Sequence, residues 1–171
     1  MKRSWTIILL LMFSLAAVSC SSRSRSVDHA GWEYEKEALM IHLQGDPLLN
    51  LYQSRPHTLV VCIYNLKDLN GFNQLVDGKG GLPALLECNR FDPGVTYAKR
   101  LIVQPGQNTK EALDRAEGAR YVGLVAGYYS LHKANSVRIY EIPTSLFKNP
   151  KKLDIKLHMG PEGIEEAKEK K

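Results

Sequence analysis

Short segments in which apolar residues alternate with polar ones recur along the second half of the chain. In the clearest, 153–159, Leu, Ile, Leu and Met occupy every second position, with Asp, Lys and His between them. A period of two places one set of side chains on each face of a strand, so this segment is expected to be a half-buried strand of an antiparallel sheet. Segment 136–142 alternates in the same way. Many such strands, with few helices and no regular βαβ order, favour a β-sandwich.

Four further strands are predicted from composition. Segment 58–66 is continuously apolar and rich in β-branched residues, which is typical of a central strand covered on both faces. Segments 38–43, 95–103 and 120–129 are the other three.

Three short helices are expected beside these strands. Apolar residues at helical spacing indicate one at 72–76, and 82–88 resembles a second with a proline in its first turn. The amphipathic segment 110–116 predicts a third, for which Asn108 or Thr109 could serve as the N-cap.

The N-terminal segment has the pattern of a bacterial secretory signal. Lys2 and Arg3 precede a short apolar run, and small residues precede Cys20, as in a lipobox whose cysteine is acylated and becomes the new N-terminus. The run is shorter than the ~20 apolar residues that a membrane span needs. Ala17 stands where a lipobox usually carries Leu, so ordinary signal-peptidase cleavage, which leaves a soluble periplasmic protein, also fits.

The sequence thus divides into four segments: a lipoprotein signal peptide at 1–19, a lipidated cysteine with a flexible tether at 20–31, a β-sandwich domain at 32–160 and a charged C-terminal tail at 161–171. Ser21, rather than Asp, follows the cysteine, which resembles an outer-membrane address. Without residues 1–19 the chain has 21 Lys and Arg against 18 Asp and Glu, a net charge of +3. That charge is spread along the chain, so nucleic acid is not indicated as a partner.

Two cysteines remain once Cys20 is assigned to lipid. In an oxidising periplasm Cys62 and Cys88 are a plausible disulfide pair. The bond would close a loop of about 27 residues and stabilise the fold by ~3 kcal/mol. Two buried free thiols are the alternative, because both cysteines have apolar neighbours.

No pattern in the sequence indicates catalysis or a metal site. None of the five histidines pairs with another His, Cys or Glu at the spacing of a zinc site. A nucleophile elbow and a Cys-x-x-Cys pair are absent, and 78–81 is expected to be a flexible turn rather than a phosphate loop. An enzyme is therefore the least favoured class.

Several features together resemble one known family, the outer-membrane lipoproteins of the type VI secretion system, called TssJ. The resemblance covers nearly the whole mature chain, and it rests on Cys20, 40–43, Leu49 with Asn50, 59–68, Phe72, Pro105 with Gly106, and 121–128. It implies a mainly β fold, a transthyretin-like β-sandwich of antiparallel strands with a few short added helices. It implies no cofactor other than the acyl chains on Cys20.

The resemblance also implies a function that is mechanical rather than catalytic. Family members lie at the periplasmic face of the outer membrane, held by lipid. They bind the periplasmic C-terminal domain of the inner-membrane partner TssM and assemble with other subunits of the membrane complex. The family's contact is the loop between the first two strands, which corresponds here to 44–57.

That loop is longer than a simple hairpin needs and is unexpectedly apolar. The expected contact residues comprise apolar anchors and a polar rim: Leu48, Leu49, Leu51 and Tyr52, with Asp46, Asn50 and Arg55. The alternative is that Leu49 and Leu51 fold back onto the sandwich.

A different function remains open, that of a periplasmic small-ligand-binding lipoprotein with the same fold. Tyr128, Tyr129 and Tyr140 would then line a cleft. A deep apolar pocket would favour this function and a filled core would count against it.

Overall fold

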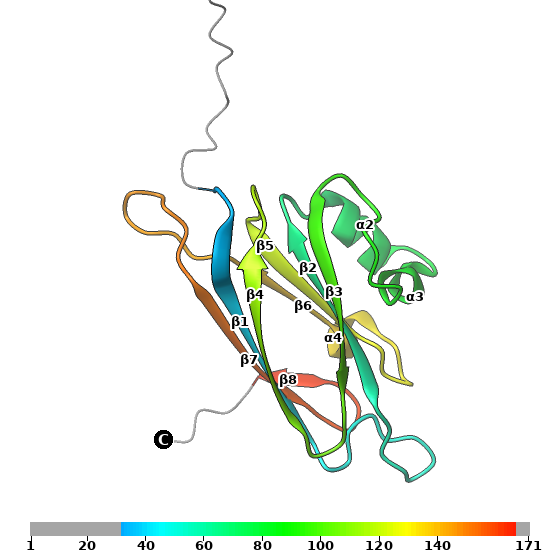
Figure 1. The fold of residues 1–171 in the computed structure, drawn as a ribbon. Coiled ribbons are helices and arrows are strands. Elements are labelled where there is room, and N and C mark those ends of the chain that lie inside the picture. Colours follow the sequence, from blue (N-terminus) through cyan, green and yellow to red (C-terminus); the bar gives the residue numbers. More distant parts are fainter. Residues whose placement is uncertain (1–31, 167–171) are drawn as a thin grey trace, which may run out of the picture.

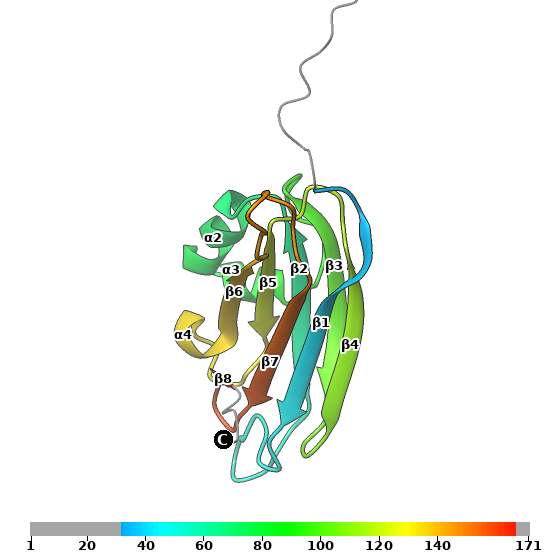
Figure 2. The ribbon, with the colours of Figure 1, turned by 90° about the vertical axis from the view of Figure 1, so that its left-hand side faces the viewer.

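Two four-stranded sheets pack face to face in the computed structural model, which describes residues 32–166 (Figures 1 and 2). The signal peptide, Cys20 and the tether lie outside the described residues, as does the end of the charged tail. The first sheet has the strand order β4-β1-β7-β8 and the second β3-β2-β5-β6.

The first sheet is built from β1 (Glu35–Gly45), β4 (Asn108–Arg115), β7 (Leu153–Met159) and β8 (Ile164–Glu166). The second is built from β2 (Leu59–Leu66), β3 (Val95–Val103), β5 (Tyr121–Ala126) and β6 (Val137–Glu141). The short helices are α2 (Asn70–Asp77), α3 (Gly81–Leu85) and α4 (Lys133–Ser136). The predicted β-sandwich with short helices is confirmed, with one difference: β1 and β7 pair in parallel.

Strand β2 is apolar at every position except Asn65, because both of its faces are covered. Val61 and Ile63 belong to the core between the two sheets. Tyr64 and Leu66, on the other face, belong to a second core beneath α2 and α3. Figure 2 shows these two helices on the outer face of the second sheet. The sandwich therefore has two apolar layers.

The second core is closely fitted around one aromatic ring. Phe72 of α2 is fully buried and packs edge-to-face on Tyr64, with ring centroids 5.8 Å apart. A Cβ on Gly123 of β5 would lie 2.9 Å from the Phe72 ring, so only glycine admits the ring here. A disulfide between Cys62 and Cys88, whose Cα atoms are 5.1 Å apart, joins β2 to the segment after α3.

Burial of Tyr64 predicts a loss of stability at alkaline pH. Desolvation raises its pKa to about 12, and its hydroxyl donates to the carbonyl of Leu85. The unfolded chain ionises tyrosine near its ordinary value of 10.0, so the stabilisation is complete below that pH and is lost as the pH rises from 10 towards 12.

The free energy of unfolding, measured in urea at about pH 8 and about pH 11, is therefore expected to fall. The variant Tyr64→Phe, which has no hydroxyl to ionise, should lose less over the same interval. An equal loss in both proteins would contradict this role for Tyr64.

The helix predicted at 110–116 is wrong, because this segment forms β4. It pairs antiparallel with β1, with Leu43 opposite Thr109 and Leu39 opposite Leu113. Its side chains alternate between more and less exposed, as on a sheet edge. Pairing with a long neighbouring strand outweighs the local helical preference of Glu, Ala and Leu.

The predicted charged tail begins too early. Residues within it form β8, which pairs antiparallel with β7. Ile164 supplies the reason, since its side chain is 4% exposed and packs into the core between the sheets. A single apolar residue in a charged segment gave no periodic signal.

Candidate functional site

The loop between β1 and β2, residues 46–58, lies at the end of the sandwich opposite to the point where the described chain begins (Figure 1). We call this the loop end. Main-chain hydrogen bonds tie the loop to the segment after β7: Asp46 N–H donates to the Met159 carbonyl at 2.9 Å and Leu51 N–H to the Pro161 carbonyl at 2.8 Å. The loop is therefore a fixed part of the domain surface.

Asn50 is the central support of this loop. It is 4% exposed and has φ of 49°, a left-handed conformation that asparagine tolerates better than most residues. Its side-chain Nδ2 donates to the Thr58 carbonyl at 3.1 Å, and its Oδ1 accepts from the N–H of Tyr129 at 3.0 Å. One amide thus joins the last residue of the loop, Thr58, to the segment after β5.

Replacing Asn50 by alanine is expected to lower the free energy of unfolding by about 2 kcal/mol, because two buried hydrogen bonds and a tolerated backbone conformation are lost. Chemical denaturation measures this change. The variant Asn50→Gly accepts the same φ without the side chain, so it isolates the hydrogen bonds and should lose about 1 kcal/mol less than the alanine variant. Wild-type stability in both variants would contradict the supporting role.

Three rings form an aromatic patch at the loop end: Tyr52, His57 and Tyr129. The rings of Tyr52 and Tyr129 are stacked, with centroids 4.3 Å apart and an interplanar angle of 13°. His57 meets Tyr129 edge-on at 5.0 Å. Both tyrosines remain about half exposed, at 45% and 55%. The patch is therefore rigid and open to solvent.

The tip of the loop holds Tyr52 in place. Tyr52 and Arg55 exchange two main-chain hydrogen bonds, of 2.9 and 3.0 Å. Gln53 and Ser54 between them both have positive φ, 48° and 60°, as in a tight turn of type I′. The turn leaves the side chains of Tyr52 and Arg55 at the surface.

An open hollow of about 390 Å³ adjoins the aromatic patch. It is lined by residues from three separate segments: Asn50, Leu51, Tyr52, Tyr128, Tyr129, Ser130, Pro161 and Glu162. Aromatic walls beside a polar rim suit a protruding side chain from another protein.

The expected contact residues differ widely in exposure. Leu48 is 51% exposed, and Tyr52 and Arg55 are exposed as well, so all three are available to a partner. Leu51 is half-buried. Leu49 is fully buried in the core between the sheets, so its expected role as a surface anchor is wrong.

The two remaining expected residues support the loop from within. Asn50 is buried, as described above. Asp46 is half-buried: its Oδ1 accepts from Leu48 N–H at 2.7 Å, and its Oδ2 lies 3.1 Å from His158 Nε2 on β7. Its carboxylate therefore fixes the start of the loop.

Two ring residues of the patch were not expected to act together. No sequence pattern groups His57 with the tyrosines, and Tyr129 is expected only as one of three tyrosines that would line a ligand cleft. The patch depends on a contact between residues 77 positions apart, 52 and 129, which no local pattern could reveal.

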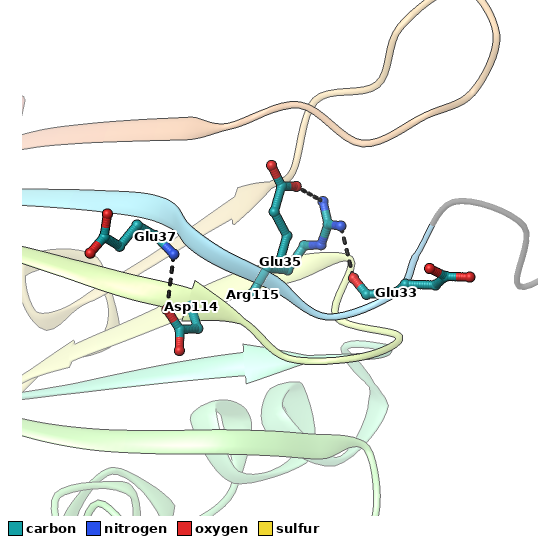
Figure 3. Close-up of polar contacts among 5 residues, drawn as sticks. All are labelled: Glu33, Glu35, Glu37, Asp114 and Arg115. Carbon is teal, nitrogen blue, oxygen red and sulfur yellow. Dashed lines mark hydrogen bonds and ion pairs between the residues drawn. The ribbon is translucent and has the colours of Figure 1, made fainter.

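The opposite end, which we call the N-terminal end, holds the first described residue firmly. The guanidinium groups of Arg115 and Arg120 each lie 5.6 Å from the centre of the Trp32 ring. The Trp32 carbonyl accepts from Gly118 N–H at 2.7 Å. Figure 3 shows the buried Arg115 between the Glu33 carbonyl, at 2.9 Å, and the Glu35 carboxylate, at 3.2 Å. The chain thus enters the domain at a fixed point.

The described residues contain no group of three or more His, Cys, Asp or Glu side chains that could hold a metal ion. Within that part of the chain, no helix is long and apolar enough to cross a membrane. The features at its surface are a rigid aromatic patch at one end and a fixed point of chain attachment at the other. These features define a small β-sandwich with a distinct surface at each end.

The sequence places the chain in a family. Residues 37–160 match the family described as type VI secretion lipoprotein, VasD, EvfM, TssJ. The chain belongs to this family of membrane-associated secretion lipoproteins, as the resemblance predicted. A search among curated proteins finds no match.

Solved structures agree on the fold. The lipoprotein TssJ1 from Pseudomonas aeruginosa aligns with a TM-score of 0.58 at 17% identity, covering 81% of this chain and 98% of that one. Lip from Serratia marcescens, a membrane-bound component of the type VI secretion system, aligns with a TM-score of 0.63 at 18% identity, covering 78% and 97%. A chain in a structure of the TssM C-terminal domain from EAEC aligns with a TM-score of 0.59 at 15% identity, covering 76% and 97%.

Proposed function

We propose that this chain is a non-enzymatic anchor of a type VI secretion membrane complex at the periplasmic face of the outer membrane. Acyl chains on Cys20 hold one end in lipid. The loop end binds the periplasmic C-terminal domain of TssM, the inner-membrane partner, so that the domain links the two membranes.

The aromatic patch is the observation that carries the binding role. Exposed tyrosines that are already ordered lose little side-chain freedom on binding, and tyrosine is common among the residues that dominate interface energy. Tyr52 and Tyr129 are stacked before any partner arrives, and Asn50 holds both of their segments. Leu48 and Arg55 extend the surface on the same loop.

The geometry of the sandwich supports a linking role. Trp32 and the β1–β2 loop lie at opposite ends of β1 (Figure 1). Eleven residues of strand span about 36 Å. If the domain is tethered at one end and bound to its partner at the other, its strands lie roughly parallel to the force between the two attachment points.

The comparisons support the choice of partner. One similar structure is that of a TssM C-terminal domain, and another is described as the type VI membrane complex. The ligand-carrier alternative has less support: Tyr128 and Tyr129 do line the hollow, but Tyr140, the third tyrosine expected there, does not. The hollow is open to solvent rather than deep.

Loss of acylation should separate localisation from partner binding. In cells that lack the native gene, Cys20→Ser is expected to leave the outer-membrane fraction, since durable attachment needs more than one acyl chain. The domain itself should still bind TssM, because residue 20 lies outside the sandwich. A Cys20→Ser chain that remained in the outer membrane and supported secretion would contradict the anchoring role.

A further inference from the structure

The loop between β6 and β7, residues 142–152, projects two large apolar side chains into solvent. Leu146 is 100% exposed and Phe147 is 86% exposed, the highest fractions among the exposed large apolar residues of the described chain. Neither the Leu146 side chain nor the Phe147 ring packs against the domain. Adjacent apolar side chains that project in this way indicate a contact with something other than water.

The backbone beneath these two residues is fixed. Ser145 N–H donates to the Asn149 carbonyl at 2.8 Å, and Lys148 N–H donates to the Ser145 carbonyl at 2.9 Å. Thr144 and Pro150 form an isolated bridge at the base of the loop. Leu146 and Phe147 therefore form the tip of a closed turn rather than part of a loose strand end.

Within the loop itself, the charged side chains are all of one sign. Lys148, Lys151 and Lys152 follow the two apolar residues, and no Asp or Glu occurs between Pro143 and Lys152. All three lysines are exposed. Apolar side chains ahead of a group of lysines are typical of segments that enter the interface of an anionic membrane.

The loop lies at the N-terminal end of the sandwich. Strands β1 and β7 run in parallel, with Leu39 opposite Leu153, so the residues just before each strand lie at the same end. Figures 1 and 2 both show the β6–β7 loop at the end where the described chain begins. Eleven residues separate Cys20 from Trp32, so the chain between them spans at most about 40 Å.

We propose that Leu146 and Phe147 insert into the interfacial layer of the membrane that carries the acylated chain, while the three lysines contact anionic lipid headgroups. The inference rests on the proposed acylation of Cys20. It gives the domain a second membrane contact, which fixes its orientation and points the aromatic patch away from the lipid.

A fluorescence experiment with the full acylated chain tests this contact. A Leu146→Cys chain, purified from membranes, is labelled with an environment-sensitive dye and reconstituted into vesicles of phosphatidylethanolamine and phosphatidylglycerol. A Ser54→Cys chain, labelled at the loop end, is the matched control. We expect brominated lipids to quench the dye at position 146 at least about threefold more than the dye at position 54.

Two further variants test the two parts of the contact. In the Leu146→Cys background, Phe147→Asp should reduce quenching to the level of the control. Replacing Lys148, Lys151 and Lys152 together by glutamine, or omitting phosphatidylglycerol, should reduce quenching about twofold or more. Quenching that is unaffected by both charge changes would overturn the role of the lysines.

The remaining outcomes separate this inference from the proposed function. If the labelled chain floats with the vesicles but positions 146 and 54 are quenched equally, the loop contact is wrong and acyl anchoring stands. If the chain does not float with the vesicles, anchoring and loop contact are both wrong. If the purified TssM domain, and not lipid, changes the emission at position 146, the loop binds protein instead.

Discussion

Replacing Tyr52 and Tyr129 together by alanine is expected to raise the dissociation constant for the TssM C-terminal domain at least about 100-fold. The two rings form one stacked unit, with centroids 4.3 Å apart, and they supply most of the exposed apolar surface of the aromatic patch. Truncation of both side chains removes that surface without creating a cavity in the core between the two sheets. Biolayer interferometry with the immobilised TssM domain measures the change.

Tyr97→Ala provides a matched control for this loss. Tyr97 is 39% exposed, close to the exposure of Tyr52, but it lies on β3 and lines a different hollow. Its replacement should change the dissociation constant less than about twofold. If the double variant bound within about threefold of the wild type while remaining folded, the aromatic patch would not be the contact.

Replacing Phe72 by alanine is expected to lower the free energy of unfolding by about 4 kcal/mol. Its ring is 1% exposed and fills the space between α2 and the second sheet, against Tyr64 and the bare backbone of Gly123. Since the disulfide between Cys62 and Cys88 holds the neighbouring segment in place, the cavity cannot close completely. Chemical denaturation under non-reducing conditions measures the loss.

Phe72→Leu is the control for size, because it keeps a large apolar side chain. It should lose about 1.5 kcal/mol, less than half of the alanine effect. The aromatic patch lies at the loop end, and its three residues do not belong to the second core around Phe72. Partner binding by folded Phe72→Ala protein should therefore match the wild type. Equal losses for the leucine and alanine variants would contradict the close fit around the ring.

The fold was predictable where a strand carries its own signal. The continuous apolar run of β2 requires a strand that is covered on both faces. The strict alternation of β7 requires a strand that is covered on one face. The structure has both. Strand β4 had no such signal, because Lys110, Glu111 and Ala112 favour a helix when considered alone. These residues form a strand because they pair with the edge of β1, which is more than 60 residues away along the chain.

The candidate site was predictable only as a segment. An apolar residue in a loop looks the same in the sequence whether it faces a partner or the core. Leu48 and Leu49 are neighbours, yet one is 51% exposed and the other is fully buried. The chain separates them by turning at Asp46, whose carboxylate binds the N–H of Leu48. The stacking of Tyr129 on Tyr52 depends on the complete fold.

The arrangement of the two ends suits a domain that carries load. At the N-terminal end, the Trp32 ring is held by Arg115 and Arg120, so a pull on the preceding chain reaches β1 directly. At the loop end, the Asn50 side chain connects the end of the loop, at Thr58, to the segment after β5, at Tyr129. Tension between the ends runs along β1, which is hydrogen-bonded on both edges, to β4 and β7.

Titration calorimetry of fragment 21–171 with the TssM C-terminal domain of the same bacterium tests the central claim most directly. The fragment contains both cores, all of whose residues lie between 39 and 164. We expect saturable binding at a single site, which the Tyr52→Ala/Tyr129→Ala variant loses and the Tyr97→Ala variant keeps. No saturable heat from a fragment that circular dichroism shows to be folded would contradict the claim that this domain links TssM to the outer membrane.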